Sequence, residues 1–131
     1  MSARQRCNVL QCALYEENHE IAKMLCEELY DPENELDLAV YGVLSCCMEG
    51  KGIDLVKCVI NTEIADKMNE RKYNDLVEKA IGEGRVDILK YLEEEVRPIP
   101  YVERLVQQYA NDASNREVSA YLEQVMNQRE G

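Results

Sequence analysis

The chain has 131 residues, of which 26 are acidic and 15 are basic, so its formal net charge is −11. This length suits one ordinary domain or a short array of repeats. The acidic balance argues against nucleic acid and anionic membranes as partners, because phosphate binding relies on clustered lysine and arginine. It permits a basic protein partner, and it is equally typical of a well-solvated surface.

The six cysteines all lie in the first 58 residues, and no two of them have the spacing of a CxxC motif. With a single histidine beside them, we expect no metal site and no cofactor. The start of the chain lacks the apolar run of a secretory signal, and no segment approaches the ~20 apolar residues of a membrane span. We therefore expect a soluble, intracellular protein (cytoplasmic or nuclear) with six reduced thiols.

An acidic residue followed by an apolar one recurs along the chain, and the apolar members are separated by 34, 33 and 30 residues. The four pairs are Glu20-Ile21, Asp54-Leu55, Asp87-Ile88 and Glu117-Val118. Eight residues before each apolar member stands a small residue, namely Ala13, Cys47, Ala80 and Ala110. Four residues after it stands an apolar one, namely Leu25, Val59, Leu92 and Leu122. A period of this length is typical of stacked supersecondary units.

Within the third unit, apolar residues recur with helical spacing at Leu76, Val77, Ala80 and Ile81, and then Gly82 and Gly84 interrupt the helix. A second helical face follows at Ile88, Leu89 and Leu92. The sequence therefore predicts an all-α fold, a solenoid of about four stacked helix–turn–helix units in one domain over residues 1–131. The expected units are 7–30, 38–62, 73–97 and 101–127. When the units are aligned without gaps, Cys47 falls at the position of the small residues, where neighbouring units are expected to pack closely. Its thiol should therefore be among the least reactive.

These units resemble the ankyrin repeat. The third supplies Val77, Ala80-Ile81, Gly84, Asp87-Ile88-Leu89-Lys90 and Leu92; the second supplies Leu44, Cys47-Met48, Asp54-Leu55-Val56-Lys57 and Val59-Ile60; the first supplies Leu10, Ala13-Leu14, Glu20-Ile21-Ala22-Lys23 and Met24-Leu25. The Thr-Pro-Leu-His tetrad and the hairpin finger of that family are absent, so short or helical connections are expected in their place. The units also resemble tetratricopeptide hairpins, through Ala13, Ala22 and Pro32 in the first unit.

No constellation of residues indicates catalysis. His19 lies close to Glu16, Glu17 and Glu20 in the sequence, but as a catalytic base it would need a nucleophile or a metal, and neither is indicated. The Gly82–Arg85 segment lacks the Gly-Lys-Ser/Thr of a phosphate loop. We expect a non-enzymatic protein–protein interaction module, an adaptor or competitive inhibitor that binds through its concave helical face. The alternatives are a structural subunit or assembly scaffold in a larger complex, and a tetratricopeptide-like peptide-binding module. The pattern leaves the oligomeric state open.

The ankyrin resemblance implies where a partner would bind. In that family the two positions after the paired small residues lie at the exposed end of the first helix. Here they are Tyr15-Glu16, Glu49-Gly50, Gly82-Glu83 and Asp112-Ala113. Each pair contains one carboxylate, so stacked units would align an acidic stripe with an aromatic ring at one end. The candidate protein-binding residues are Tyr15, Glu16, Glu49, Glu83 and Asp112.

Overall fold

The computed structural model describes residues 2–29, 38–110 and 115–130. Over these ranges the chain forms helices and no strand, which confirms the all-α prediction. In chain order the elements are α1 (Ala3–Tyr15), α2 (His19–Leu29), α3 (Leu38–Met48), α4 (Ile53–Val59), α5 (Thr62–Asp66), α6 (Glu70–Gly82), α7 (Val86–Tyr91), the π-helical turn η1 (Leu92–Val96), α8 (Val102–Tyr109) and α9 (Arg116–Glu130).

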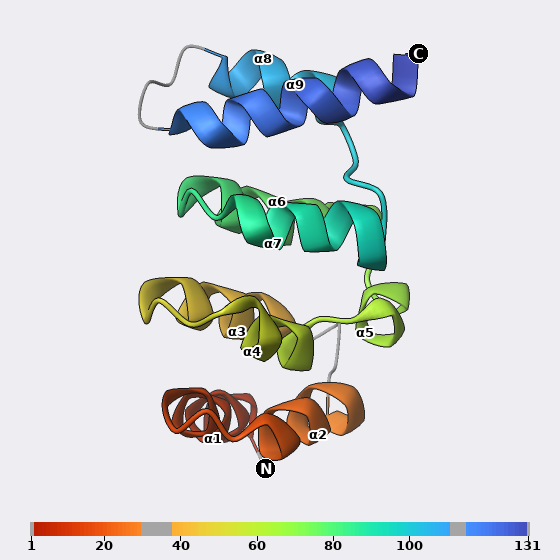
Figure 1. Ribbon diagram of the computed structural model, residues 1–131. Coiled ribbons are helices and arrows are strands. Elements are labelled where there is room, and N and C mark those ends of the chain that lie inside the picture. The colour runs from red at the N-terminus through yellow and green to blue at the C-terminus, as the bar shows by residue number, and fades with distance from the viewer. Residues whose placement is uncertain (1, 30–37, 111–114, 131) are drawn as a thin grey trace.

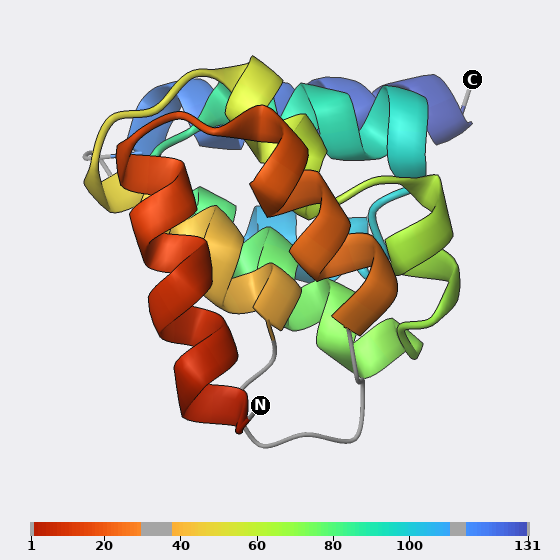
Figure 2. The same ribbon diagram turned by 90° about the horizontal axis from the view of Figure 1, so that it is seen from below.

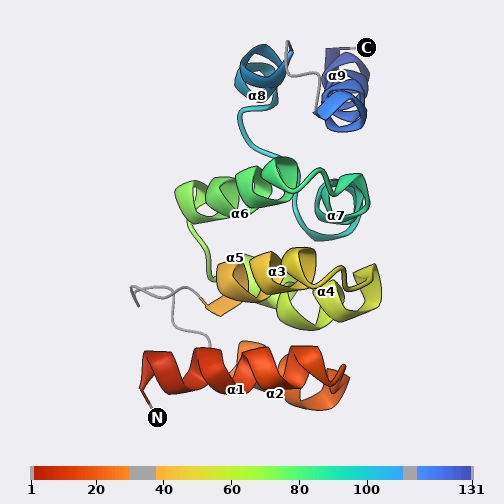
Figure 3. The same cartoon turned by 90° about the vertical axis from the view of Figure 1, so that its left-hand side faces the viewer.

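Most of the helices form pairs, and the pairs lie in layers that follow the order of the chain (Figure 1). α1 packs on α2, α3 on α4, α6 on α7, and α8 on α9. The first helices also contact one another, α1 with α3 and α3 with α6, while α2 contacts α4, α4 contacts α7 and α7 contacts α9. Figure 3 shows α6 and α8 on one side and α7 and α9 on the other. Seen along the stack, α1 and α2 lie side by side at the near end (Figure 2).

The helices of the four pairs lie within residues 3–29, 38–59 and 70–96 and, for the last pair, 102–109 and 116–130. The sequence pattern did not reveal α5, which lies in the connection between the second and third pairs. This short helix begins where the Asn61 side chain accepts a 3.0 Å hydrogen bond from the Ile64 amide. Asparagine is a favourable N-cap because its side-chain oxygen binds an amide that the helix itself leaves unpaired.

Other helix starts are fixed in the same way. Ser2 and Gln5 form a reciprocal capping box at α1, with hydrogen bonds of 3.2 and 2.8 Å. Asn18 accepts from the Ile21 amide at the start of α2, and Asn69 caps α6. These polar residues mark where α1, α2 and α6 begin.

One continuous apolar core runs through the layers. Small side chains are buried in the first helix of three pairs: Ala13 in α1, Cys46 in α3 and Ala80 in α6. The expectation of Cys47 at this position was wrong, because Cys47 is only partly buried and Cys46 is fully buried. The cause is the length of the second turn, described below.

The third pair ends in the π-helical turn η1, which the sequence pattern did not indicate. The Arg97 amide donates to the Leu92 carbonyl, five residues back, at 2.8 Å. The buried Tyr73 hydroxyl donates to the carbonyls of Leu92 and Arg97, at 3.2 and 2.6 Å. The tyrosine therefore binds main-chain carbonyls at the point where the regular α-helical bonding stops. After this turn, residues 97–101, with Pro98 and Pro100, lead into α8.

Candidate functional site

The turns inside the first three pairs lie above one another along one edge of the molecule, at the left of Figure 1. The first three of these turns share one backbone geometry. Each contains a residue with positive φ directly after the helix cap: Glu17 (56°), Gly50 (68°) and Gly84 (68°). The next amide donates to a carbonyl five residues back: Asn18 to Ala13, Lys51 to Cys46 and Arg85 to Ala80, at 2.8, 2.8 and 3.0 Å. This pattern is the Schellman motif, which satisfies carbonyls at a helix end.

The shared geometry shows which residues of the three turns are equivalent. Directly before the positive-φ residue stand Glu16, Glu49 and Glu83, and one position earlier stand Tyr15, Met48 and Gly82. The second turn is one residue longer than the others, because the N-cap of α4 is Gly52 and not Lys51. The gapless alignment of the second unit is therefore wrong. It paired Glu49 with Tyr15, whereas the structure pairs Met48 with Tyr15 and Glu49 with Glu16.

Four of the five predicted binding residues lie on this edge and are exposed: Tyr15, Glu16, Glu49 and Glu83. The fifth, Asp112, lies outside the described residues. Sequence reasoning missed Met48, whose 73% exposure matches the 72% of Tyr15. The available signal was the pair of glycines around Lys51, which leaves the register of that turn open. We call Tyr15, Glu16, Met48, Glu49 and Glu83 the turn-edge surface.

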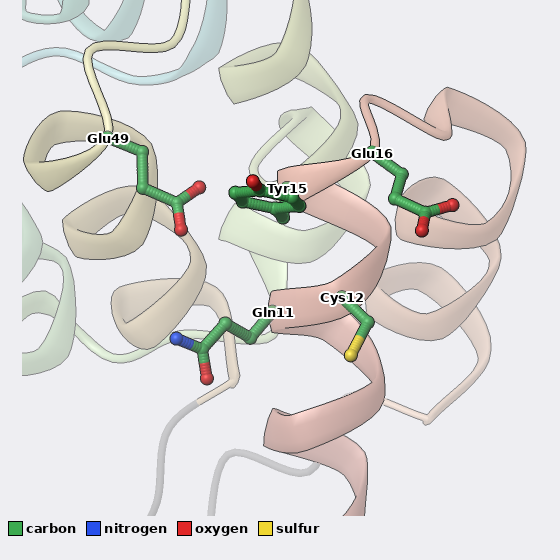
Figure 4. Close-up of a pocket in the computed structure, with 5 residues that line it drawn as sticks. All are labelled: Gln11, Cys12, Tyr15, Glu16 and Glu49. Carbon is green, nitrogen blue, oxygen red and sulfur yellow. The ribbon is translucent and has the colours of Figure 1, made fainter.

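A pocket of about 250 Å³ lies at the N-terminal end of the turn-edge surface. It is lined by Gln11, Cys12, Tyr15, Glu16 and Glu49. Figure 4 shows the Tyr15 ring between the two glutamates, with the Glu49 carboxylate directed toward the ring. The Gln11 side chain accepts a 3.2 Å hydrogen bond from the Tyr41 hydroxyl of α3. The pocket thus combines an aromatic ring with two carboxylates.

The basic groups nearby are engaged within the protein. Lys51 Nζ donates to the Tyr15 carbonyl at 3.3 Å and lies 5.8 Å from the centroid of its ring. Arg85 donates to the Lys51 carbonyl at 2.8 Å and forms two 2.9 Å bonds to the Asp87 carboxylate. The Lys51 bond connects the second turn to the first, and the Arg85 bond to the Lys51 carbonyl connects the third turn to the second.

The three glutamates of the turn-edge surface are not engaged in this way. With residues in the described ranges, the carboxylates of Glu16, Glu49 and Glu83 form no hydrogen bond or ion pair. Their charges do reach buried thiols. Glu49 contributes to raising the pKa of Cys46 and Glu83 to raising that of Cys47, although burial is the larger cause in both cases.

The thiols of α3 are poor nucleophiles. Burial raises the pKa of Cys46 to about 12 and that of Cys47 to about 11, so both are protonated at neutral pH. His19 is exposed at the start of α2. Among the described residues, no group of three or more His, Cys, Asp or Glu side chains could hold a metal ion.

The described helices include none that is both long and apolar enough to cross a bilayer. Comparison of the chain with protein-family models, with curated proteins and with solved structures gave no match.

Proposed function

We propose that the chain is a solenoid of four ankyrin-like helical units and acts as a non-enzymatic protein–protein interaction module. In this proposal the turn-edge surface, at the exposed ends of the first helices, binds the partner. The module would work as an adaptor or as a competitive inhibitor, by occupying a surface of that partner. The proposal has two parts, the repeated architecture and the binding surface, which are supported by different observations.

Repetition is supported by contacts that recur between successive layers. Lys57 Nζ of α4 lies 5.3 Å from the ring centroid of Tyr91 in the next pair. Lys90 Nζ of α7 lies 5.9 Å from the ring centroid of Tyr121 in the pair after that. The two lysines have equivalent places in the sequence pattern, and so do the two tyrosines. The same cation–π contact at equivalent positions of two adjacent layers favours a repeated unit over an irregular helical bundle.

The turns repeat as well. The same Schellman motif occurs in the turns of the first three pairs, and side-chain hydrogen bonds from Lys51 and Arg85 join these turns. This recurrence supports a repeated helix–turn–helix unit. The absence of a strand in the described residues argues against the hairpin finger of typical ankyrin repeats. The proposed units are therefore ankyrin-like only in their helix–turn–helix part.

The observation that carries the proposed function is the exposure of two large apolar side chains on one edge. Tyr15 and Met48 occupy equivalent positions and are 72% and 73% exposed. Among the described residues, the other large apolar side chains that are exposed range from 38% to 48%. Aromatic residues and methionine are enriched where proteins bind one another. Covering an exposed apolar side chain with a partner removes it from water, which favours binding.

The test is affinity purification from the native cell followed by a comparison of two variants. In the first variant Tyr15 and Met48 are both replaced by serine. In the matched control Ile21 and Met24, exposed on α2, are replaced by serine instead. We expect the first variant to lose partners that the wild-type protein and the control retain. Partners that bind all three proteins equally would contradict the proposed surface, provided that circular dichroism shows each variant to be folded.

A second candidate function, a structural subunit of a larger assembly, has one observation in its favour. The first pair has a neighbouring pair on one side only (Figure 1). It exposes Val9, Ile21 and Met24, at 39%, 38% and 48%. Terminal units of helical arrays usually have a polar outer face, so a second copy of the chain could stack here. Light scattering distinguishes the functions: a dimer that the Ile21→Ser/Met24→Ser variant abolishes would favour the subunit.

A further inference from the structure

The turn-edge surface has a chemical character that restricts its partner. Tyr15 and Met48 supply apolar contact area, while Glu16, Glu49 and Glu83 supply negative charge beside it. Resting on the proposed function, we infer that this surface binds an extended segment of a partner protein that carries arginine at every third residue. The inference depends on charge, on side-chain shape and on spacing, which are taken in turn.

Charge favours a basic occupant. Within the described residues the three glutamates have no cationic partner, whereas Lys51 and Arg85 are bound to main-chain carbonyls of this chain. The whole chain carries a net charge of −11, so an acidic segment, a nucleic acid or a second copy would be repelled. A basic segment would be attracted at long range and held at short range.

Shape favours arginine over lysine. The guanidinium group is planar, stacks on aromatic rings and binds a carboxylate with two parallel hydrogen bonds. Its aliphatic stem can cover an apolar side chain while the charged end reaches a carboxylate. The pocket at Tyr15 offers both contacts, because Glu16 and Glu49 line it together with the ring. Met48 and Glu49 repeat part of this arrangement in the next turn.

Spacing favours an extended conformation with a period of three. Equivalent positions in packed helical layers are separated by the distance between helix axes, about 8–10 Å. In a polyproline II segment every third side chain lies on one face, about 9 Å from the last. In a β-strand the side chains on one face are about 7 Å apart, which does not match. An α-helix is about 10–12 Å wide and needs a groove, whereas the pocket here is 250 Å³ in volume.

The experiment uses the full chain and synthetic peptides as probes. The test peptide repeats the tripeptide Arg-Pro-Ala, and the control has the same composition with all arginines adjacent. Fluorescence anisotropy measures each affinity at low and at high salt. We expect the periodic peptide to bind about tenfold more tightly, the equivalent of one well-formed charged contact. Both affinities should fall as salt screens the charges.

Two protein variants separate a specific site from general attraction. The first replaces Glu16, Glu49 and Glu83 with glutamine. The matched control replaces Glu63, Glu103 and Glu123, which are exposed on α5, α8 and α9, so the net charge changes equally. We expect the first variant to lose the preference for the periodic peptide and the control to retain it.

Three results would overturn the inference: equal binding of the two peptides, no binding of either, or an equal effect of the two variants. A dimer abolished by the Tyr15→Ser/Met48→Ser variant would also overturn it, because the occupant would then be a second copy. Failure of the inference is distinguishable from failure of the proposed function. If the purification identifies partners that depend on Tyr15 and Met48, the binding surface stands even when the peptides show no preference.

Discussion

Gly42 of α3 lies so close to Val59 of α4 that a methyl group would fit only if its neighbours moved by a few tenths of an ångström. A Cβ added to Gly42 would lie 3.0 Å from both Cβ and Cγ1 of Val59, and 3.2 Å from Cδ2 of Leu10 in the layer below. Glycine at this position therefore allows three helices, α1, α3 and α4, to approach closely. We expect Gly42→Ala to lower the free energy of unfolding by about 1–3 kcal/mol, because the core becomes overpacked. Urea denaturation followed by circular dichroism measures the change.

The matched control is Gly82→Ala at the end of α6. A Cβ at Gly82 meets no atom within 4 Å, so the substitution adds no clash. Alanine restricts the unfolded chain more than glycine does, and the control should raise the stability by up to about 1 kcal/mol. A similar loss in both variants would show that the tight packing at Gly42 is not the cause.

The Schellman turns give a prediction of opposite sign. Glu17 has a φ of 56° at the position that glycine occupies in the next two turns. A left-handed conformation costs a residue with a side chain about 1–2 kcal/mol, and the extra freedom of glycine in the unfolded chain offsets about 0.5–1 kcal/mol of this. Glu17→Gly should therefore stabilise the protein by up to about 1 kcal/mol. The converse change, Gly84→Ala (φ 68°), should destabilise it.

The periodic apolar pattern was sufficient to predict the helices, because each one buries a face with 3.6-residue spacing. It was not sufficient to predict the register of the second turn. Gly50 and Gly52 both break a helix, and only the positive φ of Gly50 shows which one ends α3. Because of this ambiguity the sequence pattern placed Cys47 instead of Cys46 at the buried position, and it did not identify Met48 as the exposed residue equivalent to Tyr15. Exposed turn positions carry no periodic signal from the core, so binding residues there are the hardest to predict.

The π-helical turn was unpredictable for a different reason. It depends on Tyr73, which lies 19 residues before Leu92 and donates to its carbonyl across two helices. Residues 92–96 themselves contain no glycine or proline to mark an irregular helix, and Pro98 comes only after the turn. Long-range hydrogen bonds of this kind appear only when the helices are packed.

Removal of that bond is a third test. Tyr73→Phe takes away the only polar atom of a fully buried side chain, so the Arg97 carbonyl loses this donor and the Leu92 carbonyl keeps only the Arg97 amide. We expect the free energy of unfolding to fall by about 1–3 kcal/mol. Tyr101→Phe, which removes a hydroxyl bonded to Glu70 on the surface, should have no measurable effect. Equal midpoints of urea denaturation for the two variants would contradict a structural role of Tyr73 in the turn.

The thiols should react in an order set by burial. All six cysteines are free, Cys12 is exposed and Cys46 is fully buried. In the native protein we expect iodoacetamide to modify Cys12 first, Cys47 more slowly and Cys46 last, as read by peptide mass spectrometry. After denaturation without reductant, six thiols should be titrated. Modification of Cys46 as fast as Cys12 would contradict the assigned register of α3, and Cys12→Ser should remove only the fast phase.

The last prediction concerns alkaline pH. Burial, with smaller contributions from Glu94 and Glu93, raises the pKa of Tyr121 to about 12. Burial also raises the pKa values of Tyr73 and Tyr91. In the unfolded chain a tyrosine titrates near pH 10, so above this pH the folded state binds more protons than the unfolded state. Stability from these groups is complete below about pH 10 and is lost as the pH rises through the folded pKa values.

We therefore expect the midpoint of urea denaturation to fall steeply between about pH 10 and pH 12. The buried thiols add an earlier loss, from about pH 9 upward, because their pKa values are raised in the same direction. Tyr121→Phe should make the fall less steep, since phenylalanine has no proton to lose. Tyr15→Phe is the control, because it removes the same hydroxyl from an exposed ring. If both variants kept the wild-type slope, the alkaline loss would come from other groups, and Tyr121 would not be the buried phenol that the packing of α9 on α7 implies.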